Sequence, residues 1–263
     1  MSIQMIGDRG DWKKIPQDSD LIDKLNREAD KQPKSPIPTT QPAPQAHPSA
    51  PNLNGYIYVP SIHLYVAKER ELNGLNWNRA VDKIYDQGIN IAGTRAEMPT
   101  PFEFMSYVKY LLLGNIPNLP EAERQGIVDD ILKVGNYRGN WLNARFVKLK
   151  RGFKDFGVEK VAFNSSGKRD IKTEPLEQCL WQDCWAYLSS INKQGLLTKQ
   201  YASQSYEQEK SAYFWYPREN CVAGFVASAG WADLSCSWDP GSSVASLGVR
   251  FVVRPKGVSQ KIK

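Results

Sequence analysis

Histidine is scarce in this 263-residue sequence, which contains only His47 and His63. The sequence has no His-x-x-x-His pair, no Cys-x-x-Cys pair and no carboxylate-rich calcium loop. We therefore expect neither a transition-metal site nor an EF-hand, and no bound cofactor. A Ser-His-Asp or Cys-His mechanism would have to use His63 alone, so the composition argues against an enzyme.

Cysteine is also sparse. The four cysteines are Cys179, Cys184, Cys221 and Cys236. They are too few for a disulfide scaffold in a chain of this length, so we expect reduced, buried thiols. One disulfide bridge remains the open alternative.

Long apolar runs are missing, although 41% of the residues are hydrophobic and suffice for a packed core. The sequence has no apolar run of about 18 residues, the length needed for a membrane helix. The first residues, "MSIQMIGDRGDWKK", lack the charged start, apolar middle and cleavage site of a signal peptide. We expect no signal peptide, no membrane span and synthesis in the cytoplasm.

The net charge of +6 does not by itself indicate a nucleic-acid partner. Residues 1–54 contain seven acidic and seven basic residues, so the excess lies in the later part of the chain. There it gathers in residues 146–154 and in the basic tail, residues 259–263. Neither cluster has interleaved aromatic residues, so we interpret them as a solvated loop and a solvated tail, with no specific nucleic-acid binding.

The first 52 residues are predicted to form a flexible arm. Residues 33–52 contain seven prolines and almost no large apolar side chain, which is typical of an extended linker. Before the linker, residues 19–31 have the pattern of one short helix. This helix is either simply solvated or docks on another protein or on a second copy of the chain.

The folded domain is predicted to span residues 53–258 and to have the α+β class. Strand residues come first, at 55–70, where Pro60 indicates either an edge strand or a break between two short strands. A helix at 76–88 follows. Thr100, Pro101 and Glu103 then form a specific helix-start signal for a helix ending at Gly114. Further helices are predicted at 121–135 and within 176–191. Short strands follow from residue 205 and end in a central apolar strand at 247–255.

The stretch "CVAGFVASAGWADLSCSWDPGSSVASLGVRFVVRP" (221–255) combines small residues with Trp231 and Trp238. Alternation places Phe225, Ala227 and Ala229 on one side of an extended chain and Val226, Ser228 and Gly230 on the other. The alternation resumes with Leu234 and Cys236 opposite Asp233, Ser235 and Ser237. We expect one face in the core and the other exposed. Tryptophans among exposed small residues are typical of a recognition surface, whereas a half-exposed sheet without that role is the alternative.

The run F-x-A-x-x-x-x-A-x-L-x-C-x-x-x-P-x-x-S-x-A-S-L-G-V-R, from Phe225 to Arg250, resembles the variable region of variable proteins from diversity-generating retroelements. The resemblance extends over residues 53–255, but only the last 30 or so residues are specific. It implies a C-type lectin fold related to formylglycine-generating enzymes, with two early helices, irregular inserts and a C-terminal antiparallel sheet. In that family, an error-prone reverse transcriptase diversifies selected codons of the gene.

The resemblance also divides the residues of this region into two sets. The residues implied to hold the scaffold are Phe225, Ala227, Ala232, Leu234, Cys236, Pro240, Leu247, Gly248 and Arg250. The residues implied to vary and to bind ligand are Val226, Ser228, Gly230, Asp233, Ser235, Ser237, Asp239, Ser242 and Val244, together with Trp231 and Trp238. Tyr216 and Arg218 are weaker candidates for the same surface.

The resemblance leads us to expect a protein that displays a diversified surface and binds an unidentified protein or other macromolecule. Calcium-dependent sugar binding is not expected, because the Glu-Pro-Asn, Gln-Pro-Asp and Trp-Asn-Asp motifs are missing. One alternative is an enzyme of the formylglycine-generating type, in which Cys221 and Cys236 would have to react. Another is a viral receptor-binding component carried in a virion rather than left in the cytoplasm.

Overall fold

The computed structural model describes residues 53–150, 153–203 and 205–255. These residues fall within one compact unit, Ser49–Lys263. The predicted arm at 1–52, its helix at 19–31 and the basic tail at 259–263 lie outside the described residues.

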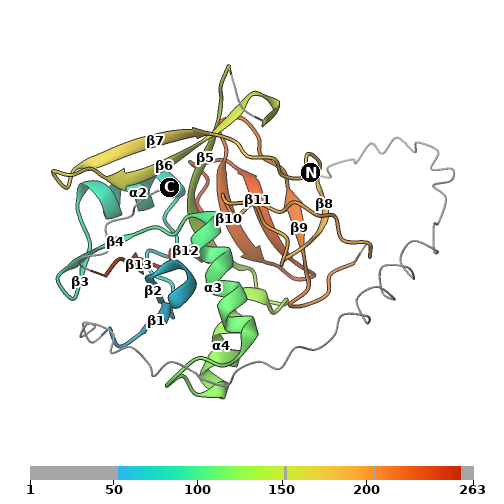
Figure 1. Ribbon diagram of the computed structural model, residues 1–263, viewed down its shortest axis with the longest axis horizontal. Helices are drawn as coiled ribbons and strands as arrows, with labels where there is room; N and C mark the ends of the chain where they lie inside the picture. Colours follow the sequence, from blue (N-terminus) through green and yellow to red (C-terminus); the bar gives the residue numbers. More distant parts are fainter. Residues whose placement is uncertain (1–52, 151–152, 204, 256–263) are drawn as a thin grey trace, which may run out of the picture. The chain divides into compact units, whose positions relative to one another are not determined.

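The described chain has a mixed α+β fold dominated by two sheets (Figure 1). The helical elements are η1 (Pro60–Ile62), α2 (Trp77–Val81), the π-helical η2 (Asp82–Asp86), α3 (Pro101–Leu113), α4 (Glu121–Leu132) and η3 (Phe153–Asp155). The five-stranded sheet has the order β1 (Tyr56–Val59), β2 (Leu64–Ala67), β13 (Val252–Val253), β4 (Thr94–Glu97) and β3 (Asn90–Ile91). The eight-stranded sheet has the order β7 (Arg169–Pro175), β6 (Phe156–Phe163), β5 (Arg138–Lys148), β10 (Val222–Ala227), β11 (Ala232–Trp238), β9 (Ser211–Trp215) and β8 (Cys184–Tyr187), with β12 (Leu247–Gly248) beside β5.

The predicted start of α3 is confirmed. The Thr100 hydroxyl accepts a hydrogen bond from the Glu103 backbone N–H at 3.2 Å, and the Glu103 carboxylate accepts one from the Thr100 N–H at 2.8 Å. Pro101 occupies the first turn, and Gly114, with φ of +87°, ends the helix. This start is predictable because every interaction in it joins residues at most three positions apart.

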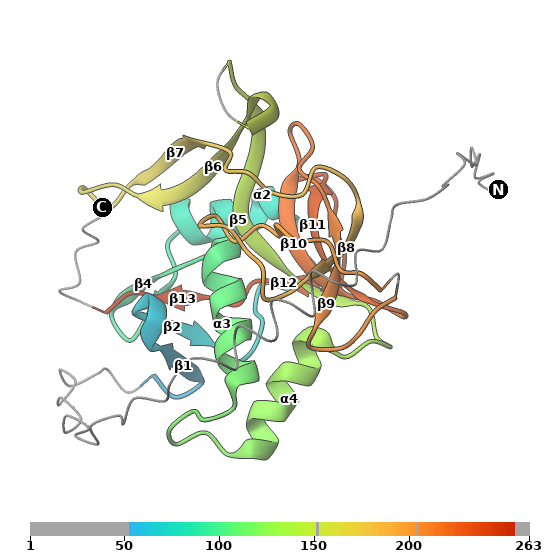
Figure 2. The same ribbon diagram turned by 45° about the vertical axis from the view of Figure 1, so that its right-hand side comes forward.

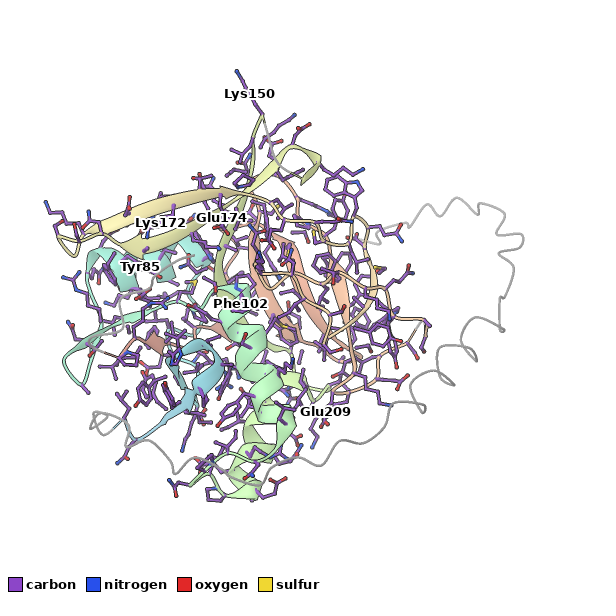
Figure 3. The ribbon with its side chains drawn as sticks, in the orientation of Figure 1. Tyr85, Phe102, Lys150, Lys172, Glu174 and Glu209 are labelled. Carbon is purple, nitrogen blue, oxygen red and sulfur yellow. The ribbon has the colours of Figure 1, made fainter. Side chains whose placement is uncertain are left out.

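The helix predicted at 76–88 is present, but it changes type. The Asn76 side chain accepts a hydrogen bond from the Arg79 N–H at 2.9 Å, and α2 then continues into η2. Tyr85 in η2 packs on Phe163 of β6, with ring centroids 5.0 Å apart, and lies beside the β6–β7 ribbons in Figure 3. Its hydroxyl group also accepts a hydrogen bond from the Asn143 side chain at 3.1 Å. The helix pair α2–η2 is thereby fixed to the eight-stranded sheet.

Residues 146–154, interpreted as a solvated loop, begin within strand β5, where Phe146 is fully buried. Two further predictions of secondary structure were wrong. The segment 176–191 is not a helix; its only regular element is β8, which pairs with β9. The final strand at 247–255 is divided into β12, which pairs with β5, and β13, which is central in the other sheet as expected. In both places, pairing with strands distant in the sequence overrode the local pattern.

The residues expected to hold the scaffold are buried, with the exception of the half-buried Pro240. Arg250, which is fully buried, donates hydrogen bonds to the carbonyls of Ala67 and Lys68 and forms an ion pair with Asp130. A Cβ atom at Gly248 would lie 2.6 Å from the Glu71 carbonyl, so only glycine fits there. All of these residues except Pro240 therefore lie in the interior of the fold.

Each face of the eight-stranded sheet has its own core. On one face, α3 and α4 pack against the sheet, as Figures 1 and 2 show, and Phe104 of α3 contacts Phe225 of β10 with centroids 5.3 Å apart. On the other face, α2 and η2 bury a second cluster that includes Trp77 and Trp141. Within the described residues, no helix has the length and apolar character that crossing a membrane requires.

Candidate functional site

The second face of the eight-stranded sheet is covered over only part of its width. Its covered half consists of Trp141 of β5, Val222 and Val226 of β10, and Trp238 at the end of β11, which all join the cluster beneath α2. Its open half consists of Trp185 of β8, Tyr213 and Trp215 of β9, and Asp233, Ser235 and Ser237 of β11. The side chains of the open half alternate with Ala186, Ala212, Phe214 and Leu234, which belong to the first core.

Hydrogen bonds and ring contacts fix the covered half in place. The indole N–H of Trp77 donates to the Leu142 carbonyl at 2.9 Å, and that of Trp141 donates to the Leu75 carbonyl at 2.9 Å. Trp238 meets Trp141 edge to face, with centroids 5.7 Å apart. The Asn78 N–H donates to the carbonyl of Pro240 at 3.3 Å, so the start of α2 also holds the turn that follows β11.

A bulge explains why Trp238 lies in the covered half. Gly224 of β10 pairs with Ser235 of β11, and Val222 of β10 pairs with Trp238 of β11. The two pairs are thus two residues apart in β10 but three residues apart in β11. The additional residue in β11 reverses the alternation, so Trp238 joins the face of Ser235 rather than that of Cys236. A strict alternation of exposed and buried residues therefore fails at this position.

Five expected surface residues are more buried than predicted, and one of them is Asp233, which is 7% exposed. Ala229, expected on the core face, is exposed instead. Val226 is only 1% exposed and packs in the covered half, so its predicted exposure was wrong. Val244 and Trp238 are partly buried against the same cluster. Ser235 is also buried, although its side chain contacts the Ser237 hydroxyl at 3.2 Å on the open half.

The open half is a row of aromatic rings beside a carboxyl group. Asp233 pairs with Tyr213 and Tyr213 pairs with Trp185, so the three side chains follow one line across β11, β9 and β8. Ser235 pairs with Trp215 in the next line. The Tyr213 ring meets Trp185 edge to face at 5.2 Å between centroids and Trp215 at 4.9 Å. Adjacent positions across strands have Cβ atoms about 5 Å apart, so Asp233 lies directly beside these rings.

Asp233 is the most perturbed carboxyl group of this surface. Its residue is 7% exposed, and burial raises the pKa of its carboxyl group from 3.8 to about 7, although a hydrogen bond from the Trp231 side chain acts in the opposite direction. No lysine or arginine of the described ranges forms an ion pair with it. An acidic group without a cation, buried among rings, is a candidate binding group.

A tight turn between β10 and β11 carries the most exposed tryptophan of the surface. The Ser228 N–H donates to the Trp231 carbonyl at 2.8 Å, and the Ser228 hydroxyl donates to the same oxygen at 3.0 Å. Trp231 is 40% exposed. The Gly135 N–H donates to the Ser228 carbonyl at 2.9 Å, which brings the exposed Tyr137 to this edge of the open half. Burial and the Asp233 charge raise the pKa of Tyr137.

The other end of β11 carries the remaining predicted residues. The Asp239 carboxylate accepts a hydrogen bond from the Gly241 N–H at 2.6 Å, and the Ser242 N–H donates to the Asp239 carbonyl at 3.1 Å. This arrangement confirms the predicted turn at "WDPG". Asp239 is exposed and Ser242 is half-exposed, so both side chains are available for contact.

Tyr216 and Arg218 do not belong to the open half. Tyr216 packs on the first core and meets Trp181, with centroids 5.5 Å apart. Arg218 lies over the Tyr216 ring at 5.5 Å and forms an ion pair with Asp183 at 2.9 Å. They form a separate exposed cluster near the end of β9.

Sequence reasoning missed the aromatic residues that make up most of the open half, Trp185, Tyr213 and Trp215. The alternation in "CWAY" and "SAYFW" carries the signal, since every second residue is aromatic. The helix predicted at 176–191 concealed it for Trp185. These residues become part of one surface only when β8 and β9 pair beside β11.

The four cysteines are free, as expected. Burial raises the pKa of all four thiols, and Cys236 lies close enough to Cys179 and Cys221 for their charges to interact. Raised pKa values leave few thiolates at neutral pH, and thiolates are the reactive form. In the described part of the chain, no three His, Cys, Asp or Glu side chains are grouped to hold a metal ion.

Comparisons with protein-family models, with curated proteins and with solved structures find nothing that matches this chain.

Proposed function

We propose that this protein is a diversified ligand-binding protein with a C-type lectin scaffold, of the kind found in the variable proteins of diversity-generating retroelements. Its recognition surface would be the open half of the eight-stranded sheet, continued by Trp231, Asp239 and Ser242. The ligand would be a protein or another macromolecule, and binding would involve no chemistry.

One observation carries the proposal, namely the separation of frame and surface. All residues expected to hold the scaffold except the half-buried Pro240 are buried, whereas Gly230, Trp231 and Asp239 from the same 30-residue region are exposed. A frame that stays fixed loses little entropy on binding, and exposed aromatic rings supply contact area. The raised pKa values of Cys221 and Cys236 favour this proposal over a formylglycine-generating type of enzyme.

A pair of libraries of the full chain tests the proposal. One library randomises five accessible positions, Gly230, Trp231, Ser237, Asp239 and Ser242, and a matched library randomises Trp141, Val222, Val226, Leu234 and Phe225. We expect folded members throughout the first library and binders to an unrelated protein, such as lysozyme, after selection. The second library should yield few folded members. Equal loss of folding in both libraries would overturn the proposal.

The neighbouring DNA offers an independent test of the retroelement origin. We expect a near-identical repeat of the coding region for residues 221–250 that differs only at adenines, close to a reverse transcriptase gene. Thiol labelling of Cys221 and Cys236 addresses the enzyme alternative, because rapid labelling and copper binding are expected only of the enzyme.

A further inference from the structure

Some half-exposed aromatic rings outside the open half are covered by a cation of the chain itself. Four such pairs occur among the described residues. They are Arg95 over Phe163 at 4.7 Å, Lys154 over Trp181 at 5.1 Å, Lys199 over Tyr187 at 5.2 Å and Arg218 over Tyr216 at 5.5 Å. The chain therefore uses cation–π contacts repeatedly at its surface.

The open half differs in this respect. In the ranges that the structure describes, no lysine or arginine lies over Trp185, Tyr213 or Trp215. Asp233, beside these rings, likewise forms no ion pair with a described cation. The site thus has two kinds of group that favour a positive charge, and the described residues supply the charge to neither.

The position of Asp233 makes the lack of a cation costly. A buried carboxylate loses hydration, and only a hydrogen bond from Trp231 offsets the loss here. A cation that reached the carboxylate would gain from charge attraction at reduced dielectric and from the negative faces of the adjacent rings. Because only 7% of the residue is exposed, a cation would have to approach it as one narrow side chain rather than as part of a large charged surface.

We propose that the open half is a socket for a single cationic side chain, arginine or lysine, presented by a partner protein. The cation forms an ion pair with Asp233 and contacts the rings of Trp185 and Tyr213. This inference rests on the proposed function and adds the chemistry of the ligand. Charge complementarity selects the occupant: a neutral sugar would leave the Asp233 charge uncompensated.

The test uses the full chain and two small probes, acetyl-arginine amide and its neutral counterpart acetyl-citrulline amide. NMR spectra of the tryptophan indole N–H groups, assigned with Trp185→Phe and Trp231→Phe variants, report on binding. We expect the arginine probe to shift the Trp185 and Trp231 signals in a saturable manner at millimolar concentrations. The citrulline probe should bind at least tenfold more weakly than the arginine probe.

A matched pair of variants locates the effect. Asp233→Asn should weaken binding of the arginine probe at least tenfold. Asp170→Asn removes an exposed carboxylate on β7 and should leave binding unchanged. Equal binding of the two probes, or equal loss in the two variants, would overturn the inference. Circular dichroism of Asp233→Asn checks that the fold is retained, and Trp185→Leu, which keeps the carboxylate, provides a second variant that should also weaken binding.

Light scattering addresses a different occupant. If the full chain forms dimers that Asp233→Asn dissociates, a second copy fills the socket and the partner proposed here is wrong. The library experiment separates this inference from the proposed function. Binders selected from the accessible library, without any response to acetyl-arginine amide, would refute the socket and leave the display function standing.

Discussion

The covered and open halves of the same sheet face differ in what lies above them rather than in composition. Each half contains two tryptophans from its strands, Trp141 and Trp238 in one and Trp185 and Trp215 in the other. Helix α2 covers the first pair, and no described helix joins the cluster around the second. Aromatic residues that a helix buries in one half are therefore partly exposed in the other.

Removal of a covered tryptophan should have the largest effect on stability. Trp141→Ala deletes a fully buried indole and its hydrogen bond to Leu75, so we expect a loss of about 3–5 kcal/mol in the free energy of unfolding. Chemical denaturation measures it. Trp231→Ala, the exposed control, should cost less than about 1 kcal/mol. Similar losses for the two variants would show that the halves do not differ as described.

Trp238 tests the boundary between the halves. Trp238→Ala removes a partly buried ring that packs on Trp141, and it should destabilise the fold by about 2–3 kcal/mol. Among described residues, its indole nitrogen has no hydrogen-bond partner. Trp238→Phe should therefore recover most of the stability in the same denaturation experiment. If Trp238→Ala leaves the free energy of unfolding unchanged, Trp238 belongs with the exposed surface residues instead.

The pH dependence of stability tests the environment of Asp233. Because burial raises the pKa of this carboxyl group from 3.8 to about 7, the folded chain holds a proton that the unfolded chain has released in this range. The contribution of Asp233 to the free energy of unfolding therefore falls as the pH rises from about 4 to about 7. Between about pH 5 and about pH 7 the fall amounts to about 2 kcal/mol.

The measurement is the difference between unfolding curves of the wild type and Asp233→Asn at several pH values. The difference should change with pH as stated, whereas Asp170→Asn should follow the wild type. A difference that stays constant with pH would mean that Asp233 titrates as an ordinary exposed carboxyl group.

The smallest effect is expected at Gly230. A Cβ atom built there meets no atom within 4 Å. Gly230→Ser should therefore change the free energy of unfolding by less than about 0.5 kcal/mol, as measured by thermal or chemical denaturation. Gly248→Ser is the matched contrast, because its Cβ would clash with the Glu71 carbonyl at 2.6 Å. Intolerance at Gly230 would argue against a variable position in this turn.

Local interactions made part of the fold predictable. The cap at Thr100, the break at Pro60 and the turn after Trp238 depend on residues a few positions apart, and all three are present. The strand β8 was missed because its pairing partner, β9, lies more than twenty residues further along the chain. Its hydrogen bonds outweigh the helical spacing of Cys184, Leu188 and Ile191.

The candidate site was predictable only in outline. The alternation around Phe225 correctly separated scaffold residues from Ser228 and Gly230, but it could not reveal that α2 covers Val226. It also could not reveal the bulge that moves Trp238 to the other face, because a bulge adds one residue without a distinct local pattern.

By itself, the amino-acid sequence determined the start of α3, the small and apolar residues of the frame, and the presence of tryptophans in a region of short side chains. The tertiary structure alone decided which of these tryptophans are covered and which adjoin Asp233. The reason is physical: capping and turn formation involve neighbours in the chain, whereas burial depends on elements that approach from distant parts of it. Trp77 and Trp238 belong to the same cluster although about 160 residues separate them.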